Sequence, residues 1–203
     1  MIEPILHSLF PTPILHSKLD RDFTNNELRF FSETKKNSKR NIGNTISKDR
    51  YVLKNPELKE LNDFFNSQLK IYCENIIEPK DDIEIRITQS WLNFSEKNEF
   101  HHVHEHPNSY ISGVFYIETN EDDKLFFYNR KYNQISVEKK NFNIWNSDIW
   151  WLPSKAYELY LFPSNLTHSV EKVKGSKIRT SLSFNTFITG KMGSYDESTE
   201  LVL

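Results

Sequence analysis

The sequence has little cysteine and no long apolar run. Cys73 is the one cysteine among 203 residues, which excludes a disulfide within the chain. No stretch approaches the roughly 18 consecutive apolar residues that a membrane-spanning helix needs. The first twenty residues also lack the basic segment and uninterrupted apolar stretch of a signal peptide. We therefore expect a cytoplasmic location and no membrane partner.

Glycine and excess charge are also scarce. With 5 glycines, the chain has little material for loops that bind phosphate groups, and it contains neither a dinucleotide-binding glycine motif nor a phosphate-binding loop. The 26 basic and 28 acidic side chains give a net charge of -2. Because nucleic-acid binding depends on an excess of positive charge, the composition does not indicate a nucleic-acid partner.

Aromatic residues, in contrast, are abundant. The chain has 15 Phe, 9 Tyr and 4 Trp, and 37% of its residues are hydrophobic, so it can bury enough apolar surface to fold. Its length suits a single hydrophobic core. We therefore expect one domain over residues 1–203.

The first part of the chain, about residues 20–78, has helical patterns. Before it, prolines at positions 4, 11 and 13 predict an extended arm packed on the domain. Residues 22–24 offer a cap for a first helix, and Asn55-Pro56-Glu57 opens a second. The second helix carries an apolar stripe at three- and four-residue steps, which predicts packing on a core. Its members are Leu58, Leu61, Phe64, Phe65, Leu69, Tyr72 and Ile76. Between the helices, the polar segment 35–49 is expected to be a mobile loop.

From residue 83 the apolar period changes from helical to alternating. Runs at 83–88, 112–119, 125–128, 149–152, 158–162 and 178–187 are separated by turn-forming residues, and each predicts a strand. Helices followed by several short strands argue against a parallel sheet. We therefore expect a mainly β protein, a sandwich or jelly roll with its core at about 83–190 and supporting α-helices before it.

Four of the seven histidines lie within six residues, just before a predicted strand: His101, His102, His104 and His106. Neutral imidazole is a good ligand for iron, zinc or copper. Residues two apart in an extended segment project to the same side, so His104 and His106 can converge on one ion, with His102 in reserve. His101 and Glu105 are expected to point away, which makes Glu105 the weaker candidate. The alternative is a solvated loop that is rich in histidine.

A jelly-roll metal site needs a further ligand from a distant strand, and His168 is the remote histidine that follows. Eleven positions later, Arg179 lies in a predicted strand in which residues 181, 183 and 185 share its face. A guanidinium that points inward is costly unless it is compensated. Compensation could come from the carboxylate of a ligand, which suits the fork of an arginine, or from a buried ion pair with Asp or Glu.

The stretch from His104 to Tyr116, HEHPNSYISGVFY, resembles one branch of the 2-oxoglutarate- and iron(II)-dependent oxygenase superfamily. The pattern of that branch is H-x-H-P-N-S-x-x-S-G-V-x-Y. Residues 9–13 resemble its opening, residues 161–164 precede its distal histidine, and residues 184–187 with 190–193 resemble its close. The resemblance covers nearly the whole chain and is weakest at 35–49 and 120–145.

This resemblance implies a double-stranded β-helix, the cupin-like jelly roll, that holds one Fe(II). His104 would be the first ligand and His168 the distal one. Most members of the superfamily have Asp or Glu at the position of His106. As in the branch it resembles, the chain has histidine there, and the implied ligand set is three neutral imidazoles.

The resemblance also implies binding of 2-oxoglutarate as a co-substrate and reaction with dioxygen. Arg179 and Ser181 would hold the far carboxylate of 2-oxoglutarate, and Asn93, on the strand before the histidines, would also contact the co-substrate. Such an enzyme, a dioxygenase and oxidoreductase, couples decarboxylation of 2-oxoglutarate to oxidation of a C–H bond, and hydroxylation is the expected outcome.

Two other functions fit parts of the sequence. A cupin-like three-histidine metal dioxygenase that does not use 2-oxoglutarate accounts better for His106, but it leaves Arg179 unexplained. A jelly-roll protein that binds a metal without catalysis is the third hypothesis. The sequence leaves four substrate classes open, namely a protein side chain, a nucleic-acid base, a free amino acid and a small metabolite, and the near-neutral charge only mildly disfavours the nucleic acid.

Overall fold

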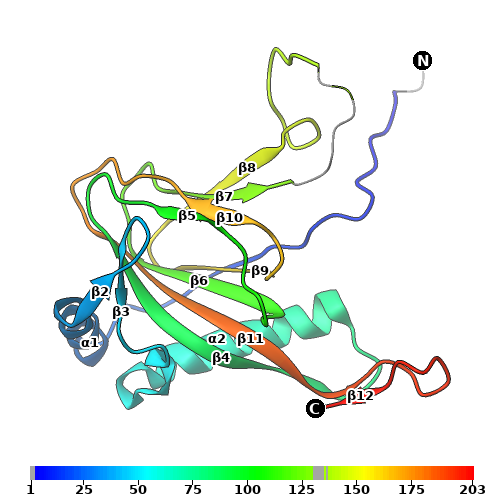
Figure 1. Cartoon of the computed structure of the whole chain (residues 1–203), viewed down its shortest axis with the longest axis horizontal. Helices are drawn as coiled ribbons and strands as arrows, with labels where there is room; N and C mark the ends of the chain where they lie inside the picture. The colour runs from blue at the N-terminus through cyan, green and yellow to red at the C-terminus, as the bar shows by residue number, and fades with distance from the viewer. Residues whose placement is uncertain (1–2, 130–134, 136) are drawn as a thin grey trace.

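The computed structural model describes residues 3–129, 135 and 137–203. Two antiparallel sheets lie one above the other, and helices cover the outer side of one of them (Figure 1). The helices are α1 (Asn25–Lys36) and α2 (Lys59–Tyr72), with short 3-10 turns at Val52–Lys54 and Pro56–Leu58 and a π-helical turn at Cys73–Ile77. The strands are β1 (Leu15–Lys18), β2 (Ser38–Arg40), β3 (Thr45–Ser47), β4 (Ile83–Ser95), β5 (His101–His104), β6 (Ile111–Glu118), β7 (Lys124–Tyr128), β8 (Ile149–Pro153), β9 (Glu158–Pro163), β10 (His168–Val170), β11 (Arg179–Met192) and β12 (Leu201–Val202).

The chain passes back and forth between the two sheets. Within the described residues, the larger sheet has the order β1-β9-β6-β11-β4-β3-β2, with β12 paired to β11, and the smaller has the order β5-β10-β7-β8. Consecutive strands from β4 to β11 alternate between the sheets, except that β7 and β8 form a pair within the smaller one. This is the double-stranded β-helix, so the predicted mainly β jelly roll is confirmed.

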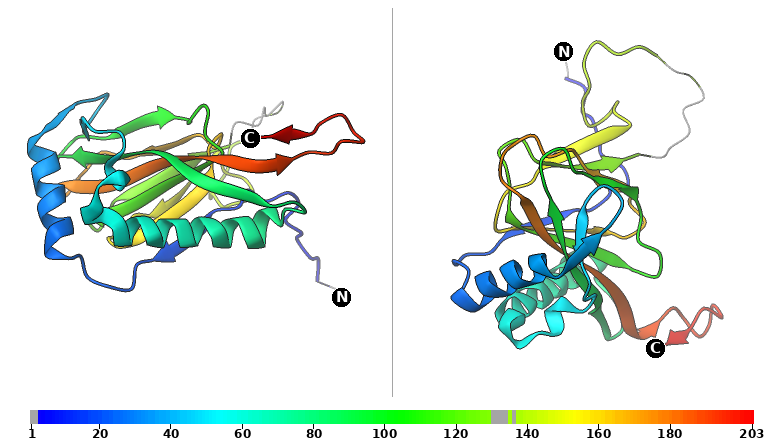
Figure 2. Two further views of the ribbon diagram at one scale, coloured as in Figure 1. Left: turned by 90° about the horizontal axis from the view of Figure 1, so that it is seen from below. Right: turned by 60° about the vertical axis from the view of Figure 1, so that its left-hand side comes forward.

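The helices support the outer face of the larger sheet, as the turned views show (Figure 2). Thr24 caps α1 in a capping box with Glu27, which satisfies backbone N–H groups at the start of the helix. The predicted stripe of α2 is buried at Leu61, Phe65, Leu69 and Tyr72. Phe65 packs on Phe115 and Phe184 of the sheet, with ring centroids 5.2 and 5.1 Å apart.

A second apolar cluster fills the space between the sheets. Because side chains alternate along a strand, Leu182 and Phe184 of β11 face the helices, whereas Ser181 and Ser183 face the smaller sheet. The second cluster contains Val114, Tyr116, Leu125, Phe127, Tyr160, Phe162 and Val170. The interior of the barrel is therefore apolar, apart from buried polar side chains such as Asn93 of β4, His168 of β10 and Ser181 of β11.

Two expectations about the first part of the chain need correction. The segment 35–49 is not simply a loop, because β2 and β3 form a hairpin there and β3 pairs with β4 through Thr45 and Ile46. The proline-rich arm is only partly packed. Its Leu6 and Phe10 side chains are largely exposed, and regular pairing begins at Leu15, opposite Leu161 of β9.

Among the helices of the described residues, none has both the length and the apolar character required to cross a membrane.

Candidate metal centre

Three histidines from neighbouring strands meet at one end of the barrel. β5 and β10 pair in the smaller sheet so that His104 lies opposite His168. His106 follows β5 and is anchored where its backbone N–H donates to the Ser164 carbonyl oxygen at 3.0 Å. The ligand atoms of His104, His106 and His168 all lie within 4.8 Å of one another. The structure thus brings together the three histidines that the sequence singled out.

Hydrogen bonds fix which ring nitrogen of each histidine is free. His104 Nδ1 lies 2.7 Å from the His102 carbonyl oxygen, and His168 Nδ1 lies 2.9 Å from the Leu166 carbonyl oxygen. A carbonyl oxygen can only accept, so Nδ1 carries the proton in both rings. His106 Nδ1 donates in the same way to Asn185 Oδ1 at 2.6 Å. In their neutral form, all three rings therefore present a lone pair at Nε2.

Two of these lone pairs face each other closely. His106 Nε2 and His168 Nε2 are 3.2 Å apart, although neither carries a proton to donate when both rings are neutral. Such a contact is repulsive unless a proton or a cation lies between the nitrogens. Two imidazoles that bind one metal at about 2.1 Å and at right angles have their nitrogens about 3 Å apart. The observed separation therefore suits a pair of neighbouring ligands on one ion.

The surroundings keep the three imidazoles neutral. Burial, followed by the charge of His104, lowers the pKa of His168 to about 3 and that of His106 to about 4. Burial also lowers the pKa of His104. Because a metal binds the unprotonated ring, these rings are available as ligands at neutral pH without first losing a proton.

Two residues that the sequence did not single out support His106. Trp91 of β4 stacks on its ring, with centroids 5.8 Å apart and an interplanar angle of 20°, and Asn185 of β11 accepts its Nδ1 proton. Both come from the larger sheet, whereas His104 and His168 come from the smaller. The alternation of β11 places Asn185 on the same face as Arg179, but its hydrogen bond to His106 has no signal in the sequence.

His101 does not point away from the cluster as expected. Its ring stacks on His104, with centroids 4.6 Å apart, and it lines the same cavity as the three histidines. The reason is a register shift between β5 and β10. His104 pairs with His168 and His101 pairs with Val170, so three steps along β5 match two steps along β10. The extra residue in β5 breaks the strict alternation that the prediction assumed.

His102 and Glu105 also have defined places. His101, His102 and His104 form a second group with metal-ligand spacing, but this group shares His104. His104 has a single free nitrogen, Nε2, so the two groups are alternatives for one ion. Glu105 accepts a hydrogen bond from the Thr167 hydroxyl on the outside of the cluster. Its side chain therefore points away from the three histidines, as expected.

Arg179 lies inside the barrel and is 3% exposed. Its Nη1 donates to Asp123 Oδ1 and to the Glu171 carbonyl oxygen, both at 2.9 Å. The buried ion pair that the sequence left open is therefore present. Its Nη2, however, is buried and has no hydrogen-bond partner. Half of the guanidinium fork is thus fixed, and the other half lacks the acceptor that a buried donor needs.

Ser181 and Asn93 lie side by side on the inner face of the larger sheet. They are opposite each other in the pairing of β11 with β4. Asn93 Nδ2 donates to Ser183 Oγ at 3.0 Å, whereas Asn93 Oδ1 is buried without a partner. Ser181 and Ser183 line the cavity next to His106 and His168. The structure therefore places Arg179, Ser181 and Asn93, the predicted co-substrate residues, in buried positions on the two central strands β11 and β4.

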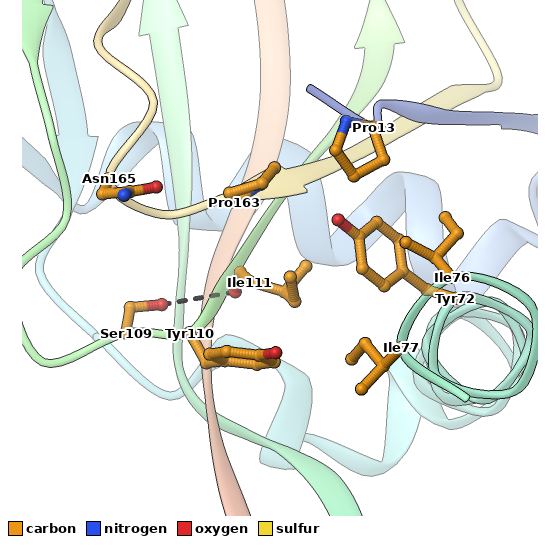
Figure 3. Close-up of a pocket in the computed structure, with 9 residues that line it drawn as sticks. All are labelled: Pro13, Tyr72, Ile76, Ile77, Ser109, Tyr110, Ile111, Pro163 and Asn165. Carbon is orange, nitrogen blue, oxygen red and sulfur yellow. Dashed lines mark hydrogen bonds between the residues drawn. The ribbon is translucent and has the colours of Figure 1, made fainter. Parts of the chain in front are cut away.

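The enclosed cavity at the histidines is small, about 20 Å³. This is room for about one water molecule, so binding of a larger molecule requires side chains of the interior to move. A separate cavity of about 500 Å³ lies between the end of α2 and the ends of β6 and β9 (Figure 3). Tyr72, Ile77 and Tyr110 line it, and none of its lining residues is a histidine. It is therefore distinct from the candidate metal centre.

Comparison with known proteins finds one family model that resembles the chain. A family model described as "Putative 2OG-Fe(II) oxygenase" matches residues 89–185, a segment that includes the three histidines, Arg179 and Asn185. No curated protein matches the chain significantly in sequence.

Solved structures of low sequence identity share the fold. An oxidoreductase of the 2OG-Fe(II) oxygenase family from Burkholderia pseudomallei is 14% identical, with a TM-score of 0.52 over 80% of this chain and 78% of that one. HygX from Streptomyces hygroscopicus, with nickel, 2-oxoglutarate and hygromycin B bound, is 11% identical, with a TM-score of 0.57 over 86% and 82%. The α-ketoglutarate-dependent epimerase SnoN from nogalamycin biosynthesis is 10% identical, with a TM-score of 0.58 over 87% and 78%. Over residues 89–185 the chain is thus similar in sequence to the 2OG-Fe(II) oxygenases, and over most of its length it shares their double-stranded β-helix fold.

Proposed function

We propose that the chain is a hydroxylase that binds Fe(II) through His104, His106 and His168 and oxidises a small molecule or a side chain. The observation that carries the metal assignment is the contact between His106 Nε2 and His168 Nε2 at 3.2 Å, with both Nδ1 atoms committed as donors. A cation between the two lone pairs relieves their repulsion. When bound, the ion would be held by these three neutral imidazoles and would supply the site at which a co-substrate and dioxygen react.

The donors inside the barrel suit 2-oxoglutarate, and the unpartnered Arg179 Nη2 supports its binding. Arg179 also donates a hydrogen bond to the carbonyl oxygen of Glu171. Glu171 is three residues beyond His168, and three residues of an extended chain span about 10 Å. A five-carbon diacid extends over much of that length. The cavity of about 20 Å³ means that the interior must open to admit it. We assign Arg179 and Ser181 to its distal carboxylate and Asn93 to a further contact with the co-substrate.

When bound, Fe(II) and 2-oxoglutarate would supply the oxidising chemistry by oxidative decarboxylation with dioxygen. The residues of the chain would position the metal ligands and keep water out of the site. Asn185 and Trp91 hold the His106 ring, backbone carbonyls hold the other two rings, and Leu125 and Phe162 exclude water from the cavity. Hydroxylation is the simplest outcome of this chemistry. SnoN, which shares the fold, is an epimerase, so product analysis has to establish the reaction of this chain.

The first test measures iron and succinate. The chain reconstituted with Fe(II) without oxygen should bind one ion, and air with 2-oxoglutarate should then give succinate. His168→Ala should lose both, whereas His7→Ala, in the exposed arm, should lose neither. Iron binding without succinate, together with oxygen consumption that does not depend on 2-oxoglutarate, would instead establish the cupin-like dioxygenase. The ion pair of Arg179 with Asp123 favours that alternative, because it compensates the guanidinium charge without a co-substrate.

The second test concerns Arg179 and is measured by calorimetry on manganese-loaded protein. Arg179→Ala would leave Asp123 buried without its partner, which is strongly destabilising. Arg179→Lys is the better variant, because an ammonium group can keep the pair with Asp123 but does not replace the free Nη2. We expect it to weaken 2-oxoglutarate binding about tenfold or more and to leave manganese binding unchanged. Equal affinities in the two proteins would refute this role of Arg179.

A further inference from the structure

The cavity between the end of α2 and the ends of β6 and β9 lies on the helix side of the larger sheet (Figure 3). Its volume of about 500 Å³ is in the range of small-molecule sites. Apolar side chains form much of its wall: Pro13, Ile76, Ile77, Ile111 and Pro163. Among the described residues that line it, none is an Asp, Glu, Lys, Arg or His. Because an ion buried among apolar groups needs a partner of opposite charge, the cavity suits an uncharged molecule.

A π-helical turn, Cys73–Ile77, follows α2 and forms one side of the cavity. Its hydrogen bonds close after five residues instead of four, so the backbone is wider there than in an α-helix. The wider turn brings Ile77, five residues after Tyr72, onto the face of the helix that Tyr72 occupies, and both side chains line the cavity. Turns of this kind are rare and are frequently found at functional sites. The shape of the cavity therefore depends on an unusual stretch of backbone.

The Tyr72 side chain offers a hydrogen-bond donor to the cavity. The residue is 2% exposed, and its ring projects from α2 so that the hydroxyl points into the space between Pro13, Pro163 and Ile111 (Figure 3). In the part of the chain that the structure describes, this hydroxyl makes no hydrogen bond. Leaving a buried hydroxyl without a partner is unfavourable. The Tyr72 hydroxyl therefore needs an acceptor that a molecule in the cavity can supply.

The polar groups that the cavity offers are mainly donors. Burial raises the pKa of Tyr72 to about 12 and also raises the pKa of Tyr110, whose phenol lines the cavity. Both hydroxyls are therefore protonated at neutral pH and can donate. Ser109 differs, because its hydroxyl accepts from Ser164 Oγ at 2.8 Å and donates to a backbone carbonyl oxygen at 3.2 Å. The tyrosine donors are thus left for a ligand, together with the amide of Asn165, and their complement is an acceptor oxygen.

We propose that this cavity is a binding site for a compact, uncharged and mainly apolar molecule that carries a carbonyl oxygen, as a ketone, ester or amide does. The Tyr72 hydroxyl donates to that oxygen, and the isoleucine and proline side chains cover the apolar part. A carbonyl oxygen accepts without adding a donor that would need a partner of its own. The site does not depend on the proposed function, because it shares no residue with the three histidines or with the residues assigned to 2-oxoglutarate.

Ligand-detected NMR on the full chain tests the proposal with three probes of similar size. Acetophenone has an apolar ring and one carbonyl oxygen, ethylbenzene has no acceptor, and benzoate carries a charge. Acetophenone should bind saturably with a dissociation constant of roughly 1 mM, as expected for a probe of about nine heavy atoms. Benzoate at about ten times the concentration should not displace it, because no cation is among the described residues of the cavity wall.

Two variants locate the probe in the cavity. Tyr72→Phe should weaken acetophenone binding about 3- to 10-fold, the usual value of one hydrogen bond between uncharged groups, and should leave ethylbenzene binding unchanged. Ile76→Trp should abolish the binding of both probes, because the larger ring fills the cavity. Ile71→Trp is the matched control. Ile71 and Ile76 are 41% and 40% exposed, but Ile71 does not line the cavity, so this variant should bind both probes as the wild type does.

Four results would overturn the proposal. Acetophenone that does not bind saturably would show that the cavity holds only water. Binding that survives in Ile76→Trp would place the probe elsewhere on the protein. Equal affinity of wild type and Tyr72→Phe for acetophenone would remove the hydroxyl as the donor, and displacement of acetophenone by benzoate would contradict the uncharged ligand. Should Tyr72→Phe fail to fold, the comparison of Ile76→Trp with Ile71→Trp still decides whether the cavity binds the probe.

Discussion

At the scale of single residues, the metal centre depends on groups that orient the ligands. Asn185 is the clearest case, because its side-chain oxygen accepts the Nδ1 proton of His106 and so turns Nε2 toward His168. His104 and His168 are oriented by backbone carbonyls, which substitution cannot remove. His106 is therefore the histidine whose orientation can be tested by a side-chain change.

We expect Asn185→Leu to weaken metal binding about 10- to 100-fold, the usual effect of losing a group that orients a metal-bound histidine. Asn185→Asp keeps an oxygen acceptor and should retain most of the affinity. Competition with a chelator, followed by the spectrum of bound Co(II) or Mn(II), measures both. If Leu and Asp weaken binding equally, the hydrogen bond is not what holds His106.

Residue types and spacing predicted which histidines meet but not how all of them point. His104, His106 and His168 converge as the alternation of an extended segment and a distant partner predicted. His101 turns inward because β5 has an extra residue relative to β10, and such a bulge has no signature in the local sequence. Asp123 could not be found either, because it lies in an acidic turn and is brought to Arg179 only by the fold.

At the scale of elements, Gly113 shows why the sequence motif has a glycine in the middle of β6. Gly113 is paired with Phe184 of β11, and an added Cβ would lie 2.1 Å from the Phe184 ring. That ring stacks on Phe65 of α2, with centroids 5.1 Å apart. The glycine therefore lets the aromatic ring lie over the sheet and form the contact that holds α2 in place.

Gly113→Ala should destabilise the fold by about 1 to 3 kcal/mol, the typical cost of forcing extra atoms into a packed core. Denaturant unfolding measures the change. In the double variant Gly113→Ala/Phe184→Leu, the smaller side chain leaves room for the methyl group, so the double change should cost less than the sum of the two single changes. Additive costs would show that Gly113 is not needed for this close approach.

The elements themselves were largely predictable, and the exceptions have physical reasons. The apolar stripe of α2 and the alternating runs from residue 83 each became the expected element, because burial of one face demands those periods. The hairpin of β2 and β3 was missed because its strands have three residues each and are mostly polar. Ile46 alone is a buried apolar anchor there, and one residue cannot establish a period.

At the scale of the whole molecule, the candidate metal centre joins the two sheets. His104 and His168 belong to the smaller sheet, whereas His106 is held by Trp91 and Asn185 of the larger one. Without an ion, the lone pairs of His106 and His168 repel each other across this junction. Binding of a metal should therefore stabilise the native state as a whole, because the unfolded chain does not hold the ligands together.

A thermal shift experiment tests this linkage. A ligand that binds only the native state stabilises it by about 2.7 kcal/mol at 100 times its dissociation constant. For a chain of this size, this amounts to a rise of about 5 to 10 °C in melting temperature. We expect Mn(II) to produce such a rise in wild type and EDTA to reverse it. His168→Ala should lose the rise, whereas His7→Ala, which leaves the cluster intact, should keep it. If His168→Ala shows the same rise as wild type, the stabilising ion binds elsewhere, and the junction of the two sheets is not the metal centre.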